Sequence, residues 1–260
     1  MSEAGAAGRA ELSVFLIVKD EAARLPRTLA AVREIADQIV VVDSGSSDDT
    51  VALAEAAGAE THFRAWTGYG AQKRFAEGLC RCGWRLNLDA DEVVTEALAQ
   101  EIRALLAQAP PPAAYEVRIL NVYPGDAGPR PFADDYRVVR LYHRDAGAYR
   151  DHPLFDRVET TGEVRRLAAP IHHFPFLTWH ALVEKENAYS SFQAEAAAAK
   201  PLWLLRLRLI TEGPWVFFKS LILRRHLFGG WKGIAFSGVI AFARWLRIVK
   251  LLARETEGRR

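Results

Sequence analysis

Cysteine is nearly absent from this chain, and its scarcity excludes several classes of protein. The two cysteines among 260 residues are Cys80 and Cys82. A C-x-C pair lacks the four ligands of a structural zinc site, and two neighbouring thiols close no useful loop, so a disulfide-stapled fold is excluded. We therefore interpret both thiols as packing residues of a protein in a reducing compartment.

The chain also lacks a visible secretory signal and a long uninterrupted apolar segment. Residues 1–10 are small and polar, so we expect a flexible N-terminus and a cytoplasmic protein. The longest uncharged apolar stretch in the C-terminal part, residues 233–243, is well short of the ~20 residues that a spanning helix needs. A membrane-spanning protein is therefore not expected.

What the chain does have is a large apolar fraction and an uneven distribution of charge. Half of its residues are hydrophobic and a quarter are charged, which excludes disorder and permits a sizeable core. From Lys200 onward, 13 basic residues stand against three acidic ones, a net charge of +10, whereas the preceding 199 residues carry −8. This pattern indicates an acidic body followed by a basic, apolar tail.

The first 107 residues alternate between strand and helix patterns. Strand patterns occupy 12–18, 38–42, 59–63 and 85–88, and helix patterns occupy 25–35, 46–57, 71–79 and 95–107. Such alternation predicts an α/β fold with a mostly parallel sheet and flanking crossover helices. Strand character returns at 115–122 and 136–143.

Acidic residues gather where the predicted parallel strands end, which is where ligands of such sheets bind. Asp20 and Glu21 follow the first strand, Asp43 ends the second, and Asp89 and Asp91 follow the fourth. Because side chains two apart in a strand point the same way, Asp89 and Asp91 are expected to lie side by side. Two such carboxylates need a cation, and a hard divalent ion would supply it.

Other polar residues near these strand ends have two interpretations each. Asp43 can accept hydrogen bonds from a base or ribose, or it can simply build the turn that follows it. Lys73 can contact a phosphate or be an ordinary surface lysine. The histidines fit no standard zinc spacing, but His173 could contact a diphosphate or an acceptor. Because no G-x-G-x-x-G motif is present, a dinucleotide site is disfavoured.

Four segments in this order resemble family 2 glycosyltransferases of the GT-A fold. They are LSVFLIVKDEAARLPRTL, VVVDSGSSDDT, GYGAQKRFA and WRLNLDADE. More narrowly, the chain is similar to bacterial enzymes that add a hexose to the lipopolysaccharide inner core. The resemblance implies a nucleotide-diphosphate-sugar donor, with a UDP-hexose favoured, and Mg²⁺ or Mn²⁺. It puts Asp43 at the base and ribose with Asp20 or Glu21 nearby, Asp89 at the donor and metal, and Asp91 at the metal.

The resemblance also implies a carboxylate base and a basic strand. The family often has a His-Glu or His-Asp pair where this chain has Phe155–Asp156, so Asp156 is the implied base on the acceptor hydroxyl, with Asp151 in reserve. Arg140 and Arg144 resemble the family's basic strand beside the acceptor. A solvated strand face explains these two arginines equally well.

We expect a catalytic domain over residues 11–180 and a helical region over 181–260. Helices that combine Trp, Phe and Leu with Lys and Arg are typical of membrane interfaces. This region is therefore predicted to bind an anionic membrane surface as a peripheral element, on the inner face of the cytoplasmic membrane. The alternative is a helical subdomain that packs on the catalytic domain or on another subunit. Nucleic acid is disfavoured as a partner because so much of the tail is apolar.

The sequence therefore predicts an inverting, metal-dependent glycosyltransferase with a lipid-borne acceptor such as the lipopolysaccharide core. Three alternatives remain. The acceptor could be polyprenyl phosphate or another glycan. A nucleotidyltransferase would also use paired carboxylates, but its glycine-rich basic loop is absent. Finally, the chain could be a non-catalytic membrane-binding protein with a nucleotide-sugar fold.

Overall fold

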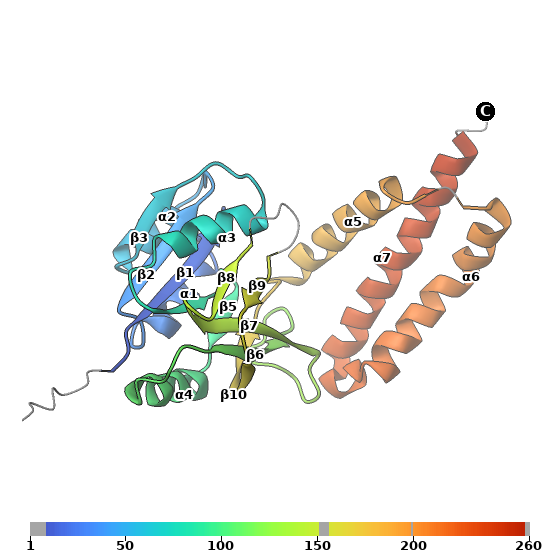
Figure 1. Ribbon diagram of the computed structural model, residues 1–260. Coiled ribbons are helices and arrows are strands. Elements are labelled where there is room, and N and C mark those ends of the chain that lie inside the picture. The colour runs from blue at the N-terminus through green and yellow to red at the C-terminus, as the bar shows by residue number, and fades with distance from the viewer. Residues whose placement is uncertain (1–8, 151–155, 199, 258–260) are drawn as a thin grey trace, which may run out of the picture. The chain divides into compact units, whose positions relative to one another are not determined.

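The computed structural model describes residues 9–150, 156–198 and 200–257, which form two compact units (Figure 1). One unit comprises the chain up to Leu120 together with Asp135–His173; we call it the α/β unit. The other comprises Asn121–Asp134 and the chain from Phe174 onward; we call it the helical unit. The loop 121–134 therefore belongs with the C-terminal helices and not with the strands on either side of it.

The α/β unit contains an eight-stranded sheet in the order β3-β2-β1-β4-β7-β6-β10-β5. Its strands are β1 (Leu12–Val18), β2 (Gln38–Asp43), β3 (Glu60–Phe63), β4 (Trp84–Asn87), β5 (Glu92–Val94), β6 (Ala114–Asn121), β7 (Asp135–His143) and β10 (Val164–His173). The pairs among β3, β2, β1 and β4 are parallel, whereas β7 runs antiparallel to both β4 and β6, and β10 to β5. Strands β8 (Gly147–Tyr149) and β9 (Val158–Thr160) form a separate hairpin. The predicted α/β fold is confirmed.

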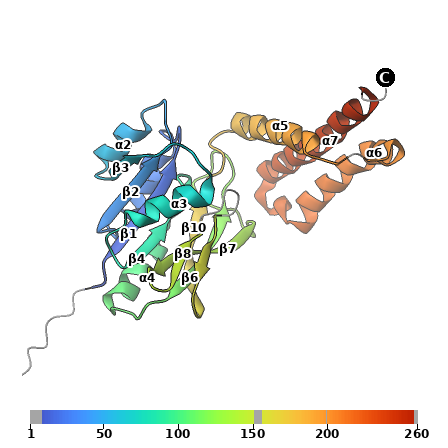
Figure 2. The same cartoon turned by 45° about the horizontal axis from the view of Figure 1, so that its top comes forward.

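Helices cover both faces of this sheet (Figures 1 and 2). They are α1 (Leu25–Val32), α2 (Thr50–Ala56), α3 (Tyr69–Gly78) and α4 (Glu96–Ala107). Side chains of β1 alternate between two buried clusters: Val14 and Leu16 pack with α1 and α4, whereas Phe15 packs with α3. A strand that is buried on both faces needs apolar side chains at nearly every position, which explains the continuous apolar sequence of residues 12–18.

The two cysteines are free and buried in the α/β unit, in agreement with their interpretation as packing residues. Burial raises the pKa of the Cys80 thiol to about 12, so it stays protonated at neutral pH. At the N-terminus, residues 1–8 lie outside the described part of the chain. Next to them, Arg9 donates to Asp37 at 3.0 Å and the Ala10 amide donates to the Leu106 carbonyl at 3.0 Å.

The helical unit consists of three long helices and the turn between the last two. The helices are α5 (Trp179–Glu195), α6 (Leu202–Phe218) and α7 (Gly230–Glu257). The turn between α6 and α7 contains a π-helical segment η1 (Lys219–Leu223) and a 3₁₀ segment η2 (His226–Gly229). Helix α7 packs against both α5 and α6 (Figure 1). The loop 121–134 joins this unit through a hydrogen bond of 2.5 Å between the Tyr123 hydroxyl and His226 Nδ1, and through an ion pair between Asp126 and Lys232.

Helix α6 is continuous over Leu202–Phe218. Pro214 lies inside it, and the indole of Trp245 donates to the Leu209 carbonyl, at 3.1 Å, in the turn before the proline. Within the described ranges, no helix combines the length and the apolar character that crossing a bilayer demands.

Candidate active site

The loops after β1 and β2 are joined by hydrogen bonds at the carboxyl edge of the sheet, as the parallel topology predicts. Asp20 has a left-handed backbone with φ of 54°, and its carboxylate accepts from the Ser47 amide at 2.7 Å. Asp43 accepts from the Gly45 amide at 2.8 Å and from the Ser46 hydroxyl at 2.5 Å. In this structure Asp43 therefore builds the turn that follows it, which gives the loop a fixed shape.

The loop after β4 is tied to the loop after β1 by Arg24. The guanidinium of Arg24 donates to Glu21 at 2.6 Å and lies 3.3 Å from Asp91 Oδ2. The same oxygen of Asp91 is 3.3 Å from Nε2 of His173, at the end of β10. Burial acts to lower the pKa of His173, but the hydrogen bond and charge of Asp91 outweigh it and raise that pKa.

Asp89 is held by two buried cations. Its Oδ1 lies 2.9 Å from Nζ of Lys73 on α3, and its Oδ2 lies 2.7 Å from the guanidinium of Arg140 on β7. Arg140 also contacts Glu92 at 2.5 Å, and Lys73 also contacts Asp156 Oδ2 at 3.0 Å. We call these five residues, which come from four separate parts of the sequence, the Asp89 cluster.

Burial makes the charges of this cluster interdependent. The side chains of Lys73 and Arg140 are 1% and 5% exposed, and that of Glu92 is 0% exposed. Burial works to raise the pKa of Asp89, but the charges of Arg140 and Lys73 outweigh it and hold that pKa well below its usual range. Asp89 is therefore ionised, and each buried cation has the anionic partners it requires.

Asp89 and Asp91 do not lie side by side as strand alternation predicted. Strand β4 ends at Asn87, and a turn follows in which the Glu92 amide donates to the Asp89 carbonyl at 3.0 Å. The turn abolishes the alternation, so Asp89 faces Lys73 and Arg140 whereas Asp91 faces Arg24 and His173.

A pocket of about 420 Å³ adjoins the cluster in the α/β unit. Asp89, Arg140 and Asp156 line it, together with Tyr136 of β7. This volume falls within the range of about 300–1,000 Å³ typical of small-molecule sites. One pocket thus brings together the candidate donor carboxylate, the candidate base and a fixed positive charge.

The remaining candidate residues have different outcomes. Lys73 and Arg140 are buried, so the surface alternatives for these two residues are wrong. Arg144 is exposed and follows the pairing of His143 with Trp84, at the end of β4 opposite to Asp89. The structure therefore does not bring Arg144 to the Asp89 cluster. Asp151 lies outside the described residues.

Glu92 was not among the predicted site residues. It accepts from the Asp89 amide at 3.1 Å and from Arg140, and so fixes both the backbone and the charge partner of Asp89. Asn87 supports the same arginine by accepting from Arg140 at 2.8 Å and from the Tyr149 hydroxyl at 2.7 Å. The signal for Glu92 in the sequence was its charge at the start of the otherwise apolar segment 92–94.

The residues near Asp91 fit a divalent cation only in part. Asp91 and His173 offer one carboxylate and one imidazole next to each other. Within the part of the chain that the structure describes, no group of three or more His, Cys, Asp or Glu residues is placed to hold a metal ion. The carboxylate of Asp91 suits Mg²⁺ or Mn²⁺, which bind through one or two carboxylates and complete their coordination with substrate phosphates and water.

Comparison with known proteins identifies the family. The model of glycosyl transferase family 2 matches residues 13–165. An uncharacterised glycosyltransferase of Rickettsia felis is 38% identical over 252 residues, which cover 93% of this chain and 89% of that protein. The lipopolysaccharide core biosynthesis glycosyltransferase LpsC of Rhizobium meliloti is 30% identical over 223 residues, 83% of this chain and 82% of that protein.

A solved structure of glucosyl-3-phosphoglycerate synthase from Mycobacterium tuberculosis overlaps less. It matches 45% of each chain at 20% identity with a TM-score of 0.34, too little to transfer a ligand or a site. The family model and the two relatives instead span most of the chain. The protein is therefore a glycosyltransferase of family 2, with an α/β fold of the GT-A type.

Proposed function

We propose that this glycosyltransferase moves a hexose from a nucleotide-diphosphate sugar, in the first place a UDP-hexose, to a lipid-borne acceptor such as the lipopolysaccharide core, with inversion at the sugar. The observation that carries the proposal is the joining of Asp89 and Asp156 through Lys73 beside one pocket. LpsC, the relative named for lipopolysaccharide core biosynthesis, supports the acceptor class.

The residues of the cluster supply the chemistry of an inverting transfer. Asp156 would take the proton of the acceptor hydroxyl, whose oxygen then forms a bond to the anomeric carbon. The bond from that carbon to the diphosphate breaks on the opposite side, and the electron pair leaves with the diphosphate. Lys73, whose ammonium lies between Asp89 and Asp156, would stabilise the charge of this leaving group.

The donor would occupy the edge formed by the loops after β1, β2 and β4. Asp43 would bind the base or ribose, and Asp20 or Glu21 would lie nearby. Asp91 and His173 would hold Mg²⁺ or Mn²⁺, and Asp89, which Lys73 and Arg140 fix in place, would position the donor. When bound, the divalent ion would neutralise charge on the diphosphate.

We also propose that the helical unit associates peripherally with the anionic inner face of the cytoplasmic membrane. Exposed apolar side chains recur at helical spacing along α6, at Trp203, Leu207, Ile210 and Phe218. The basic charge of this part of the chain complements an anionic lipid surface. A lipid-borne acceptor would be available at that surface.

The test measures donor hydrolysis and sugar transfer with a panel of UDP- and GDP-hexoses and Mg²⁺ or Mn²⁺. We expect Asp156→Asn to reduce transfer by roughly 10²–10⁴-fold, the usual contribution of a general base, while donor binding persists. Asp91→Asn or excess chelator should abolish both reactions. Asp145→Asn, an exposed carboxylate after β7, is the matched control.

Four outcomes would contradict parts of the proposal. Full turnover in excess chelator would show that the reaction needs no metal ion. Loss of transfer in Asp151→Asn but not in Asp156→Asn would assign the general base to Asp151. A folded wild-type protein that binds vesicles but hydrolyses none of the donors would favour the non-catalytic alternative. Sugar transfer to polyprenyl phosphate alone would show that this lipid, and not the lipopolysaccharide core, is the acceptor.

A further inference from the structure

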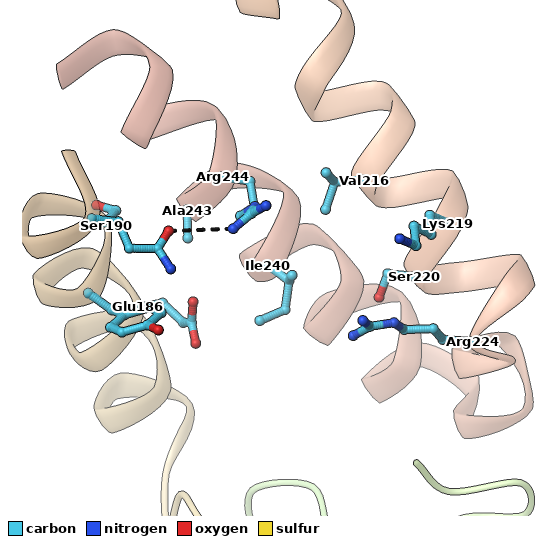
Figure 3. A pocket seen from close by; sticks show the side chains of 11 residues that line it. Glu186, Ser190, Val216, Lys219, Ser220, Arg224, Ile240, Ala243 and Arg244 are labelled. Atoms are coloured by element: carbon cyan, nitrogen blue, oxygen red, sulfur yellow. Dashed lines mark hydrogen bonds between the residues drawn. The ribbon is translucent and has the colours of Figure 1, made fainter. Parts of the chain in front are cut away.

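A second pocket lies within the helical unit, formed by α5, α7 and the end of α6 that continues into η1 (Figure 3). Its volume is about 330 Å³, close to that of the pocket beside Asp89. Helix α7 supplies its floor through Ile240 and Ala243. No residue of the Asp89 cluster takes part in it, so the pocket is separate from the transfer chemistry.

Positive charge predominates in this pocket. Lys219, Arg224 and Arg244 line it with a single carboxylate, that of Glu186. Figure 3 shows Arg224 and Glu186 pointing from opposite walls into the space between the helices. Arg244 is bound to the neutral Gln193 at 3.4 Å and lies 4.0 Å from Glu212. The pocket therefore has a net positive charge, which favours an anion.

Two of these cations, Lys219 and Arg224, are not held in a salt bridge within the described residues, although the charge of Arg224 contributes to the lowered pKa of Asp134. Among the described residues, neither Lys219 nor Arg224 has a carboxylate at salt-bridge distance, whereas Arg208 and Arg247 nearby both reach Glu212, at 2.7 and 3.4 Å. Lysine and arginine side chains that line one pocket without close salt bridges are suited to bind phosphate, which accepts several charge-assisted hydrogen bonds at once.

A neighbouring pocket is apolar and shares two residues with the basic one. Its volume is about 320 Å³, and Val183, Val239, Phe242 and Leu246 are the large apolar residues that line it. Glu186 and Ala243 line both pockets. Phe242 is 55% exposed and Val183 45% exposed, so the apolar pocket opens at the surface of the unit. A basic compartment next to an apolar one matches a ligand with a phosphate on an aliphatic chain.

We propose that the helical unit binds a phosphorylated lipid, with the phosphate among Lys219, Arg224 and Arg244 and the aliphatic chain between α5 and α7. This ligand could come from two sources, a phospholipid of the bilayer or an isoprenoid lipid phosphate. The inference does not depend on the proposed transfer reaction, because it rests on residues of the helical unit alone.

The test uses lipids that stay monomeric, so that partition into a bilayer does not obscure the pocket. Dihexanoyl phosphatidic acid and geranyl phosphate represent the two sources, and dihexanoyl phosphatidylcholine is the zwitterionic control. Calorimetry with the full chain should give binding of at least one phosphate monoester that is about tenfold tighter than binding of the zwitterion. Whichever of the two monoesters binds more tightly identifies the source.

Two variants test the two compartments. Lys219→Gln with Arg224→Gln should weaken binding of the tighter monoester about tenfold or more, because two charge-assisted hydrogen bonds are lost. The matched control, Lys200→Gln with Arg206→Gln, removes equal charge outside the pocket and should change the affinity less than about twofold.

Gly238→Leu tests the apolar compartment. Gly238 lines it, and a Cβ there would meet no heavy atom within 4 Å, so a leucine side chain starts in open space. Affinity for the tighter monoester should fall about fivefold or more, since the chain loses buried methylene groups. Equal binding of the zwitterion, an equal loss in the control pair, or unchanged binding by Gly238→Leu in a protein with unaltered circular dichroism would each overturn the proposal.

Discussion

Lys73 and Arg140 hold the acidic residues of the active site although both cations are almost inaccessible to solvent. A buried cation is stable only when anions and hydrogen-bond acceptors surround it. Lys73 and Arg140 therefore depend on Asp89, Glu92 and Asp156 as much as these carboxylates depend on them. Substitutions in the cluster affect folding as well as chemistry, and the two effects have to be measured separately.

Glu92 offers a clear measurement of the folding effect. Glu92→Gln keeps the shape of the side chain but removes one of the two carboxylates that neutralise the buried Arg140. We expect the free energy of unfolding to fall by about 3 kcal/mol, because breaking a buried pair leaves a charge uncompensated. Urea denaturation followed by tryptophan fluorescence measures this change.

Glu159 provides the matched control for that variant. It pairs with Arg150 at 3.2 Å, but both side chains are well exposed, so Glu159→Gln should change the free energy of unfolding by less than about 0.5 kcal/mol. If the two variants unfold at the same urea concentration, Glu92 does not stabilise the cluster.

The sequence was informative about the site where chemistry and local position coincide. Asp89, Lys73 and Asp156 were all candidates, and the structure brings these three together. Glu92 was missed because its importance comes from complete burial beside Arg140, which is 48 residues away in the chain. No local pattern reveals such a pairing, since it depends on how the sheet is assembled.

At the scale of elements, local signals predicted the parallel half of the sheet well. The strand predicted at 12–18 and the helix predicted from a cap at Thr95 agree closely with β1 and α4. The residues of β10 gave no comparable signal, because basic residues and Pro170 break its alternation and its pairing with β5 is long-range. Pro214 lies inside α6, which is continuous over Leu202–Phe218.

The cap at Thr95 connects a local signal to tertiary structure. Its hydroxyl oxygen accepts from the Leu98 amide at 3.2 Å and donates to the Pro170 carbonyl of β10 at 2.8 Å. Thr95→Ala should lower the free energy of unfolding by about 1–2 kcal/mol, because both the cap and the tie to β10 are lost. Thr95→Ser retains the hydroxyl and should unfold nearly as the wild type does in chemical denaturation. A serine variant as unstable as the alanine variant would assign the effect to the lost methyl group instead.

At the scale of the whole molecule, the distribution of exposed apolar side chains differs between the two units. Most of the large ones belong to the helical unit, including Trp203, Ile210 and Phe218 on one stripe of α6, with Ile210 75% exposed. Apolar patches of this kind in a soluble protein mark a binding surface. Their combination with basic residues is the basis for the proposed membrane association.

Vesicle sedimentation tests that association. Binding to phosphatidylglycerol vesicles should exceed binding to phosphatidylcholine vesicles and weaken as salt rises, because part of the attraction is screened electrostatic energy. Replacing Trp203, Ile210 and Phe218 together by serine should reduce binding about tenfold or more, since the inserted apolar area is lost.

Phe63→Ser is the control for the vesicle experiment, because Phe63 is 71% exposed but lies in the α/β unit. If it reduces binding as much as the triple variant does, the bound surface is not on α6. Equal sedimentation with both vesicle types would contradict the electrostatic contribution.

The assignment of residues 121–134 to the helical unit has a consequence for modularity. The chain leaves the sheet after β6, contributes this segment to the helical unit, and returns to form β7. A gene truncated after His173 would thus still encode Tyr123, Asp126 and Asp134 without His226 and Lys232, their partners. The helical unit is consequently not a detachable appendage. Exchange of this unit between related enzymes would require two coordinated grafts, one in the β6–β7 connection and one at the C-terminus.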